Sequence, residues 1–131
     1  MIRDLAAVAV GGALGTGLRF ALDLAFATDD GLFPLSTLIA NILGSFVLAL
    51  VVAHLWDRSP LWVRAGLGAG LLGSFTTFSA VAVAVVQLAD VDQWVLALIY
   101  LAATMVLGLA AAALGLRLGL ARRARLDLVN E

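Results

Sequence analysis

Four long apolar stretches constrain this chain more than any other feature of its sequence. They cover about residues 5–26, 34–54, 61–88 and 94–116, and only short connectors separate them. An α-helix needs about 20 mainly apolar residues to cross the hydrocarbon core of a bilayer. Of the 131 residues, 63% are hydrophobic and 13% are charged, whereas about 25% are charged in a typical soluble domain. The sequence therefore predicts one all-α integral membrane domain of four spanning helices, followed by a short basic tail over 117–131.

Several residue types that membrane transporters and metal sites use are missing from the four stretches. The chain has no cysteine and a single histidine, His54, so disulfides and a zinc site are not expected. No glutamate and no mid-helix aspartate lies in a predicted span, the nearest being Asp23. Proton-coupled transporters usually need a buried carboxylate or histidine as a relay. These absences disfavour a proton-coupled exporter of cationic drugs.

The third stretch is longer than one membrane span requires and is rich in glycine and hydroxyl residues. Glycines stand at 66, 68, 70 and 73, and Thr76, Thr77 and Ser79 follow them. Either the helix is tilted, or it is interrupted where freed backbone groups are buried or line a cavity. The pairs Gly11/Gly15, Gly66/Gly70 and Gly115/Gly119 have the spacing of close helix packing, within one subunit or across a dimer.

The basic residues are distributed unevenly. Lysine is absent, and seven of the eight basic residues flank one set of helix ends: Arg3, Arg58, Arg64, Arg117, Arg122, Arg123 and Arg125. The other side carries Arg19, inside the first stretch, and five acidic residues: Asp23, Asp29, Asp30, Asp90 and Asp92. Arg19 could pair with Asp23 four residues on, or lie near an anion path. By the positive-inside rule, both termini and the connector between the second and third helices are predicted to be cytoplasmic.

Uncharged hydrogen-bonding side chains form stripes on two of the predicted helices. The second stretch has Thr37, Asn41 and Ser45, and the fourth has Tyr100 and Thr104, all at intervals of four residues, which lie on one helix face. Such hydroxyls often join membrane helices or bond back to the carbonyl of residue i−4. Alternatively, they line a pathway, and uncharged N–H and O–H donors together with aromatic ring edges suit an anion better than a cation.

Three segments combine glycines with polar or aromatic residues in an apolar context: "GGALGTGLRF" (11–20), "FPLSTLIANILGSF" (33–46) and "GLLGSFTTFS" (70–79). They resemble the signature segments of the CrcB/Fluc family of fluoride channels. The resemblance implies an antiparallel dimer of four-helix subunits with two narrow pores. It also implies a third helix broken near the membrane centre, where the backbone carbonyls of Gly73 and Thr76 hold a structural sodium ion (Na+) on the dimer axis.

The same resemblance assigns roles to individual side chains. It implies that Asn41 donates a hydrogen bond to fluoride, that Phe78 presents its ring edge, and that Tyr100 and Thr104 begin a polar track. Ser79 is included in this pore lining, and Arg19 matches the arginine of the family's first helix. The implied activity is passive export of fluoride through the bacterial cell membrane, with no enzymatic reaction.

The chain departs from the family pattern at four positions. Ala80 and Val81 stand where the family usually has threonine and phenylalanine, and Gly108 and Ala112 stand where hydroxyls would continue the polar track. These losses, together with the arginine asymmetry, favour one fixed orientation and a heterodimer with a family subunit of opposite orientation. The alternative is a non-conducting structural or assembly subunit, and a saturable, proton-dependent transporter is the third reading.

Overall fold

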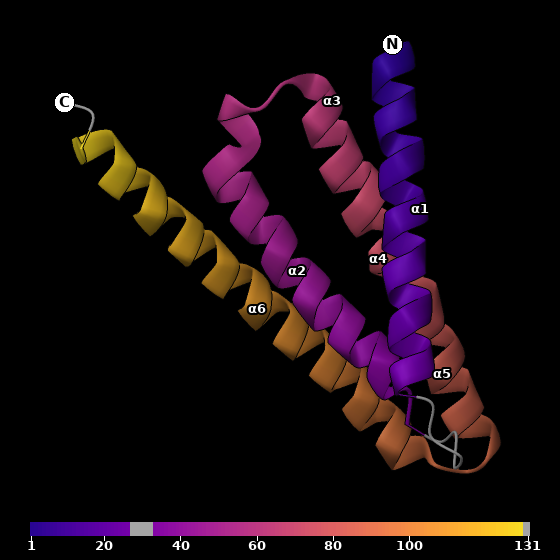
Figure 1. Cartoon of the computed structure of the whole chain (residues 1–131). Coiled ribbons are helices and arrows are strands. Elements are labelled where there is room, and N and C mark those ends of the chain that lie inside the picture. The colour runs from indigo at the N-terminus through magenta and orange to yellow at the C-terminus, as the bar shows by residue number, and fades with distance from the viewer. Residues whose placement is uncertain (27–32, 130–131) are drawn as a thin grey trace.

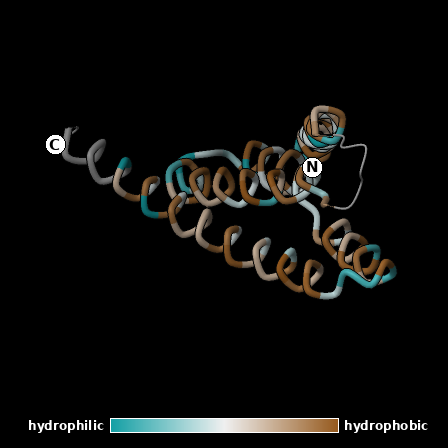
Figure 2. The backbone as a smooth tube through the Cα atoms, turned by 90° about the horizontal axis from the view of Figure 1, so that it is seen from below, coloured by the Kyte–Doolittle hydropathy of each residue, from teal (hydrophilic) through white to brown (hydrophobic). Residues whose placement is uncertain are grey.

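The computed structural model describes residues 1–26 and 33–129, and all of its regular elements are helices. In chain order they are α1 (Ile2–Ala25), α2 (Leu35–Leu55), the 3-10 turn η1 (Trp56–Arg58), α3 (Leu61–Arg64), the π-helix η2 (Ala65–Leu72), α4 (Gly73–Phe75), α5 (Phe78–Asp90) and α6 (Trp94–Val129). Four helical segments are long and apolar enough to cross a membrane. This confirms the prediction of an all-α chain with four such segments. Apolar residues run along the helices, and hydrophilic residues lie mainly near their ends (Figure 2).

Most helix ends lie within a few residues of the boundaries predicted from the sequence. Pro34 and Pro60 immediately precede α2 and α3 as N-cap residues, where a missing backbone N–H costs little. The difference lies in α6, which continues to Val129, whereas the sequence suggested a span that ends near residue 116. The residues beyond 116 are mainly leucine, alanine and arginine, which are strong helix formers. The arginines from Arg117 onward therefore end the apolar stretch that could cross a membrane, but they do not end the helix.

The four segments form two close pairs. α1 packs along η2 and α4, and α2 packs along α6, while α5 contacts the first part of α6. The start of α1, the end of α6 and the connection between α2 and α3 lie at one end of the molecule, and the turn between α5 and α6 lies at the other (Figure 1). The predicted basic and acidic groups thus lie on segments at opposite ends, with Asp90 and Asp92 at the α5–α6 turn. The predicted acidic residues Asp29 and Asp30 lie outside the described residues.

Glycines make the contact between α1 and η2 possible. Gly11 and Gly15 are the buried residues of α1. A Cβ on Gly11 would collide with the Gly66 carbonyl, and a Cβ on Gly15 with the Leu71 carbonyl. A Cβ on Gly70 would lie 2.8 Å from the carbonyl oxygen of Val8. Two of the predicted small-residue pairs therefore pack against each other within the subunit.

The third small-residue pair joins α6 to α2. A Cβ on Gly115 would collide with the Phe46 carbonyl, and one on Gly119 would lie 2.5 Å from the Cβ of Ala53. Backbone approach of this kind maximises van der Waals contact between helices in a medium that gives no hydrophobic driving force. The α2–α6 pair is therefore held by packing of small residues.

A small apolar core lies where α2, α5 and α6 meet near the α5–α6 turn. Its buried members are Leu38, Val81, Ala84, Leu88, Ala97 and Tyr100. The Tyr100 ring meets the Phe33 ring edge to face, with centroids 5.2 Å apart at 89°. Tyr100 is 0% exposed, and its hydroxyl donates to the carbonyl oxygen of Pro34 at 3.4 Å. This core fixes the base of α5 against α2 and α6.

Candidate functional site

The third apolar segment contains two residues with extended backbone between α4 and α5. Thr76 has φ −84° and ψ 155°, and Thr77 has φ −156° and ψ 126°. Threonine is β-branched, which restricts its side chain in a helix and favours extended backbone. Helical conformation therefore ends at Phe75 and starts again at Phe78, and the last N–H before the interruption to make a helical hydrogen bond is that of Thr76, which donates to the carbonyl oxygen of Leu72 at 3.0 Å.

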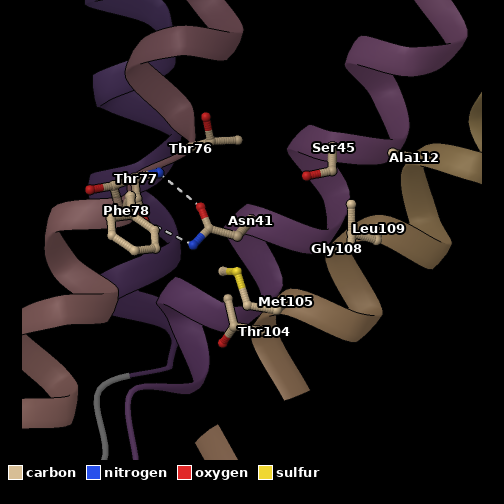
Figure 3. A pocket seen from close by; sticks show the side chains of 10 residues that line it. All are labelled: Asn41, Ser45, Thr76, Thr77, Phe78, Thr104, Met105, Gly108, Leu109 and Ala112. Atoms are coloured by element: carbon tan, nitrogen blue, oxygen red, sulfur yellow. Dashed lines mark hydrogen bonds between the residues drawn. The ribbon is translucent and has the colours of Figure 1, made fainter. Parts of the chain in front are cut away.

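The side chain of Asn41 on α2 supplies hydrogen bonds to this extended segment. The backbone N–H of Thr77 donates to Asn41 Oδ1 at 2.8 Å, and Asn41 Nδ2 donates to the carbonyl oxygen of Thr77 at 2.9 Å. The Asn41 amide thus replaces the backbone partners of both the N–H and the C=O of Thr77, as Figure 3 shows. An unpaired backbone group away from water would cost about 1–3 kcal/mol. Asn41 consequently stabilises the interruption.

Two neighbouring features complete the local fit. Gly44, one turn along α2 from Asn41, is buried, and a Cβ there would collide with the Thr76 methyl group. Thr77 caps α5, because its hydroxyl oxygen accepts from the backbone N–H of Ala80 at 3.3 Å. The Asn-x-x-Gly-Ser pattern of the second stretch (41–45) therefore fits the Thr-Thr pair of the third stretch in two ways. The Asn41 amide forms hydrogen bonds to Thr77, and Gly44, which has no side chain, leaves room for the Thr76 methyl group.

These hydrogen bonds change the partners of two backbone carbonyls. In a continuous helix, the carbonyls of Gly73 and Thr76 would accept from the N–H groups of residues 77 and 80. Here those N–H groups donate to Asn41 Oδ1 and to Thr77 Oγ1. Neither carbonyl receives its usual intrahelical hydrogen bond, so both keep lone pairs that a cation could use. Uncharged carbonyl oxygens are suitable ligands for such an ion.

A pocket of about 340 Å³ opens between α2, the extended residues and α6. Its lining is shown in Figure 3 and consists of Asn41, Ser45, Thr76, Thr77, Phe78, Thr104, Met105, Gly108, Leu109 and Ala112. None of these ten side chains is charged. The pocket therefore combines amide and hydroxyl groups with one aromatic ring and apolar walls, which is the composition predicted for an anion path.

Two threonine hydroxyls of the pocket donate to their own helices. Thr76 Oγ1 donates to the carbonyl oxygen of Leu72 at 2.9 Å, and Thr104 Oγ1 donates to that of Tyr100 at 2.8 Å. The expectation that hydroxyls bond back to the carbonyl of residue i−4 is thus confirmed for both residues. Their oxygens line the pocket, but their protons are already used.

The structure brings together only some of the residues named from the sequence. Asn41, Phe78, Thr76 and Thr104 line the pocket, and Phe78 is 66% exposed, so its ring is available to a path or to another subunit. Gly73 is the first residue of α4, the short helix that precedes the extended pair.

Four other positions lie outside the described pocket lining. Tyr100 and Val81 are buried in the core, and the Ser79 hydroxyl lies on the surface, 3.0 Å from Thr77 Oγ1. Arg19 is half-buried on α1, and among the described residues it forms no ion pair with Asp23. The pair that the sequence offered as one possibility for these two side chains is therefore not formed.

The sequence placed Ser45 in a polar stripe with Thr37 and Asn41 without assigning it a role of its own in the site, and it gave Gly44 no role. Both belong to the Asn-x-x-Gly-Ser pattern, and Ser45 follows Asn41 by four residues. That spacing puts the two polar side chains on one face of α2, and this signal was present in the sequence.

Comparison with known proteins identifies the family. The CrcB-like protein family, Camphor Resistance (CrcB), matches residues 6–116. The chain is 42% identical over 127 residues to "Fluoride-specific ion channel FluC 3" of Streptomyces avermitilis, covering 93% of this chain and 62% of that relative. It is 43% identical over 107 residues to "Fluoride-specific ion channel FluC" of Idiomarina loihiensis, covering 79% and 82%. With "Fluoride-specific ion channel FluC 1" of Bacillus cereus it shares 36% over 115 residues, covering 86% and 84%. The chain thus spans less than two thirds of the length of the Streptomyces relative. These matches, together with the four membrane-compatible helices found among the described residues, show that the chain is a multi-pass membrane protein of the CrcB-like family.

Proposed function

We propose that this chain is a subunit of a fluoride-selective passive channel that exports cytoplasmic fluoride through the bacterial cell membrane. The observation that carries the proposal is the pocket beside the extended Thr76–Thr77 pair, which is lined by uncharged donors and by no carboxylate. The names of the relatives support fluoride as the ion. No enzymatic reaction is proposed.

The chemistry of fluoride explains why such a pocket is useful. Neutral HF crosses the bilayer, dissociates in the cytoplasm and leaves fluoride trapped as an anion. A passive channel allows the negative membrane potential to expel it, since each charge gains about 2.3 kcal/mol per 100 mV. Selectivity requires fixed donors that replace the ion's hydration shell in a narrow path. In this proposal Asn41 supplies such a donor, and Phe78 presents the positive edge of its ring.

We further propose an antiparallel dimer with a sodium ion at its axis. The interruption at Thr76–Thr77 would then lie near the membrane centre. The carbonyls of Gly73 and Thr76 would hold the ion, and their lack of intrahelical donors makes them suitable ligands. Interrupted membrane helices commonly coordinate sodium through such carbonyls and through the negative ends of half-helices. A bound sodium would supply fixed positive charge between the subunits.

The partner in this dimer is proposed to be a second family member of opposite orientation. Seven of the eight arginines belong to segments at one end of the molecule, so a single orientation with both termini cytoplasmic is favoured. A subunit that inserts only one way needs a different chain as its antiparallel partner. Gly108 and Ala112, which line the pocket without hydroxyls, leave groups for that partner to supply.

Fluoride efflux from liposomes, followed with a fluoride electrode, tests this proposal. The chain is reconstituted alone and together with a CrcB-like chain from the same genome that has the opposite arginine bias. Efflux that requires both chains is the expected result. Equal efflux from the chain alone would refute the heterodimer, and no efflux from the pair would favour the non-conducting subunit. A dependence of the rate on a proton gradient would instead favour a transporter.

A further inference from the structure

We infer that Ser45, together with the second N–H of the Asn41 amide, forms the pair of hydrogen-bond donors that meets the anion in this subunit's pocket. Both residues lie on α2. The pair would provide this subunit's own donors beside Gly108 and Ala112, where α6 lacks hydroxyls, in addition to groups from the partner. This inference rests on the proposed function, because it assigns donors to the same anion path.

Two hydroxyl protons in the pocket lining are already used within the chain. An anion needs O–H or N–H groups whose protons are not committed elsewhere, since a hydroxyl that donates to a carbonyl offers only its oxygen. Thr76 and Thr104 donate to carbonyls of the preceding helical turn. The Thr77 hydroxyl accepts from Ala80 N and is shared with Ser79. The Thr76 and Thr104 hydroxyls are therefore poor donors toward the pocket, and the Thr77 hydroxyl already has two partners.

Two groups on α2 differ from the threonines. In the part of the chain that the structure describes, the Ser45 hydroxyl forms no hydrogen bond, although serine in a helix commonly bonds back to residue i−4. The Asn41 Nδ2 group carries two protons, and only one is used, by the carbonyl of Thr77. Each residue therefore retains one uncommitted donor.

The geometry places these two donors one above the other along the pocket. Asn41 and Ser45 are four residues apart on one helix, so they project from the same face about one turn, or 5.4 Å, from each other. Figure 3 shows both side chains extending from α2 toward the pocket. A Cβ built on Gly108 would lie 3.8 Å from Ser45 Oγ. The Ser45 hydroxyl consequently lies beside the position at which α6 has no side chain.

The first test compares two serine-to-alanine variants of α2 in the co-reconstituted channel. Ser45→Ala removes only the hydroxyl of the pocket, whereas Ser36→Ala removes a hydroxyl of the same helix that is not among the pocket residues. Loss of one hydrogen bond to a charged group is expected to lower fluoride efflux about tenfold or more for Ser45→Ala. Efflux of Ser36→Ala should match that of the unmodified chain.

A second variant separates loss of a donor from general damage to the fold. In Ser45→Ala/Gly108→Ser the hydroxyl returns on α6, next to its original place, and fluoride efflux should recover. Gly108→Ser alone adds a second hydroxyl beside Ser45 and should raise fluoride efflux above that of the unmodified chain, which gives the test a readout even if Ser45→Ala lowers the yield of folded protein. Equal efflux from Ser45→Ala and Ser36→Ala, or no recovery on adding the α6 hydroxyl, would overturn the inference while fluoride conduction itself stands. Absence of fluoride efflux from the unmodified pair would overturn the proposed function, and the inference with it.

Discussion

Replacing Asn41 with alanine should destabilise the fold through one identifiable pair of hydrogen bonds. The amide accepts from the Thr77 N–H at 2.8 Å and donates to the Thr77 carbonyl at 2.9 Å, across 36 residues of sequence. Each hydrogen bond contributes about 1 kcal/mol net, and a backbone group left without a partner adds to the cost. Because the site is only partly buried and water can reach it, we expect Asn41→Ala to lower the free energy of unfolding by about 2–4 kcal/mol.

The measurement is an SDS titration of the purified protein in mixed micelles, followed by circular dichroism. Gln87→Ala is the matched control, since Gln87 carries an exposed amide on α5 that forms no hydrogen bond among the described residues. Surface substitutions of this kind usually change stability by less than about 0.5 kcal/mol. An Asn41→Ala loss no larger than that of Gln87→Ala would refute the role of the amide in holding the extended Thr76–Thr77 segment.

Two further predictions concern packing and the anion path. Gly15→Ala should destabilise the protein by about 1–3 kcal/mol, because its Cβ would collide with the η2 backbone. Gly17→Ala, where no atom lies within 4 Å of the added Cβ, is its control in the same SDS titration and should stay within about 1 kcal/mol of the unmodified protein. Phe78→Ile keeps an apolar side chain but removes the ring edge, so fluoride efflux should fall sharply. Unchanged efflux would place Phe78 in a pore that does not conduct.

The sequence was sufficient for the helical architecture. Apolar stretches separated by short connectors predict spanning helices, because length and polarity decide whether a segment can cross a bilayer. Pro34 and Pro60 located two helix starts. The end of α6 was missed, because the criterion of apolar length ends where Arg117 begins the basic tail, whereas helix propensity continues to Val129.

The candidate site was only partly predictable. The spacing of Asn41 and Ser45 identified a polar face on α2, and the Thr-Thr pair suggested an interruption as one of two possibilities. Spacing along one helix says nothing about which other element faces it. The burial of Tyr100, whose ring packs against Phe33 in the core, could not be read from its spacing on the fourth stretch.

By itself, the sequence determined that this chain is helical, apolar enough for a membrane and asymmetric in charge, since these properties depend only on composition and on order along the chain. The tertiary structure decided which donors of the pocket are already used and which are left. That property depends on partners far apart in sequence, because the Asn41 amide is used by Thr77 in the extended segment before α5. It also depends on hydroxyl conformation, since Thr104 donates to its own helix, whereas the Ser45 hydroxyl has no such hydrogen bond among the described residues.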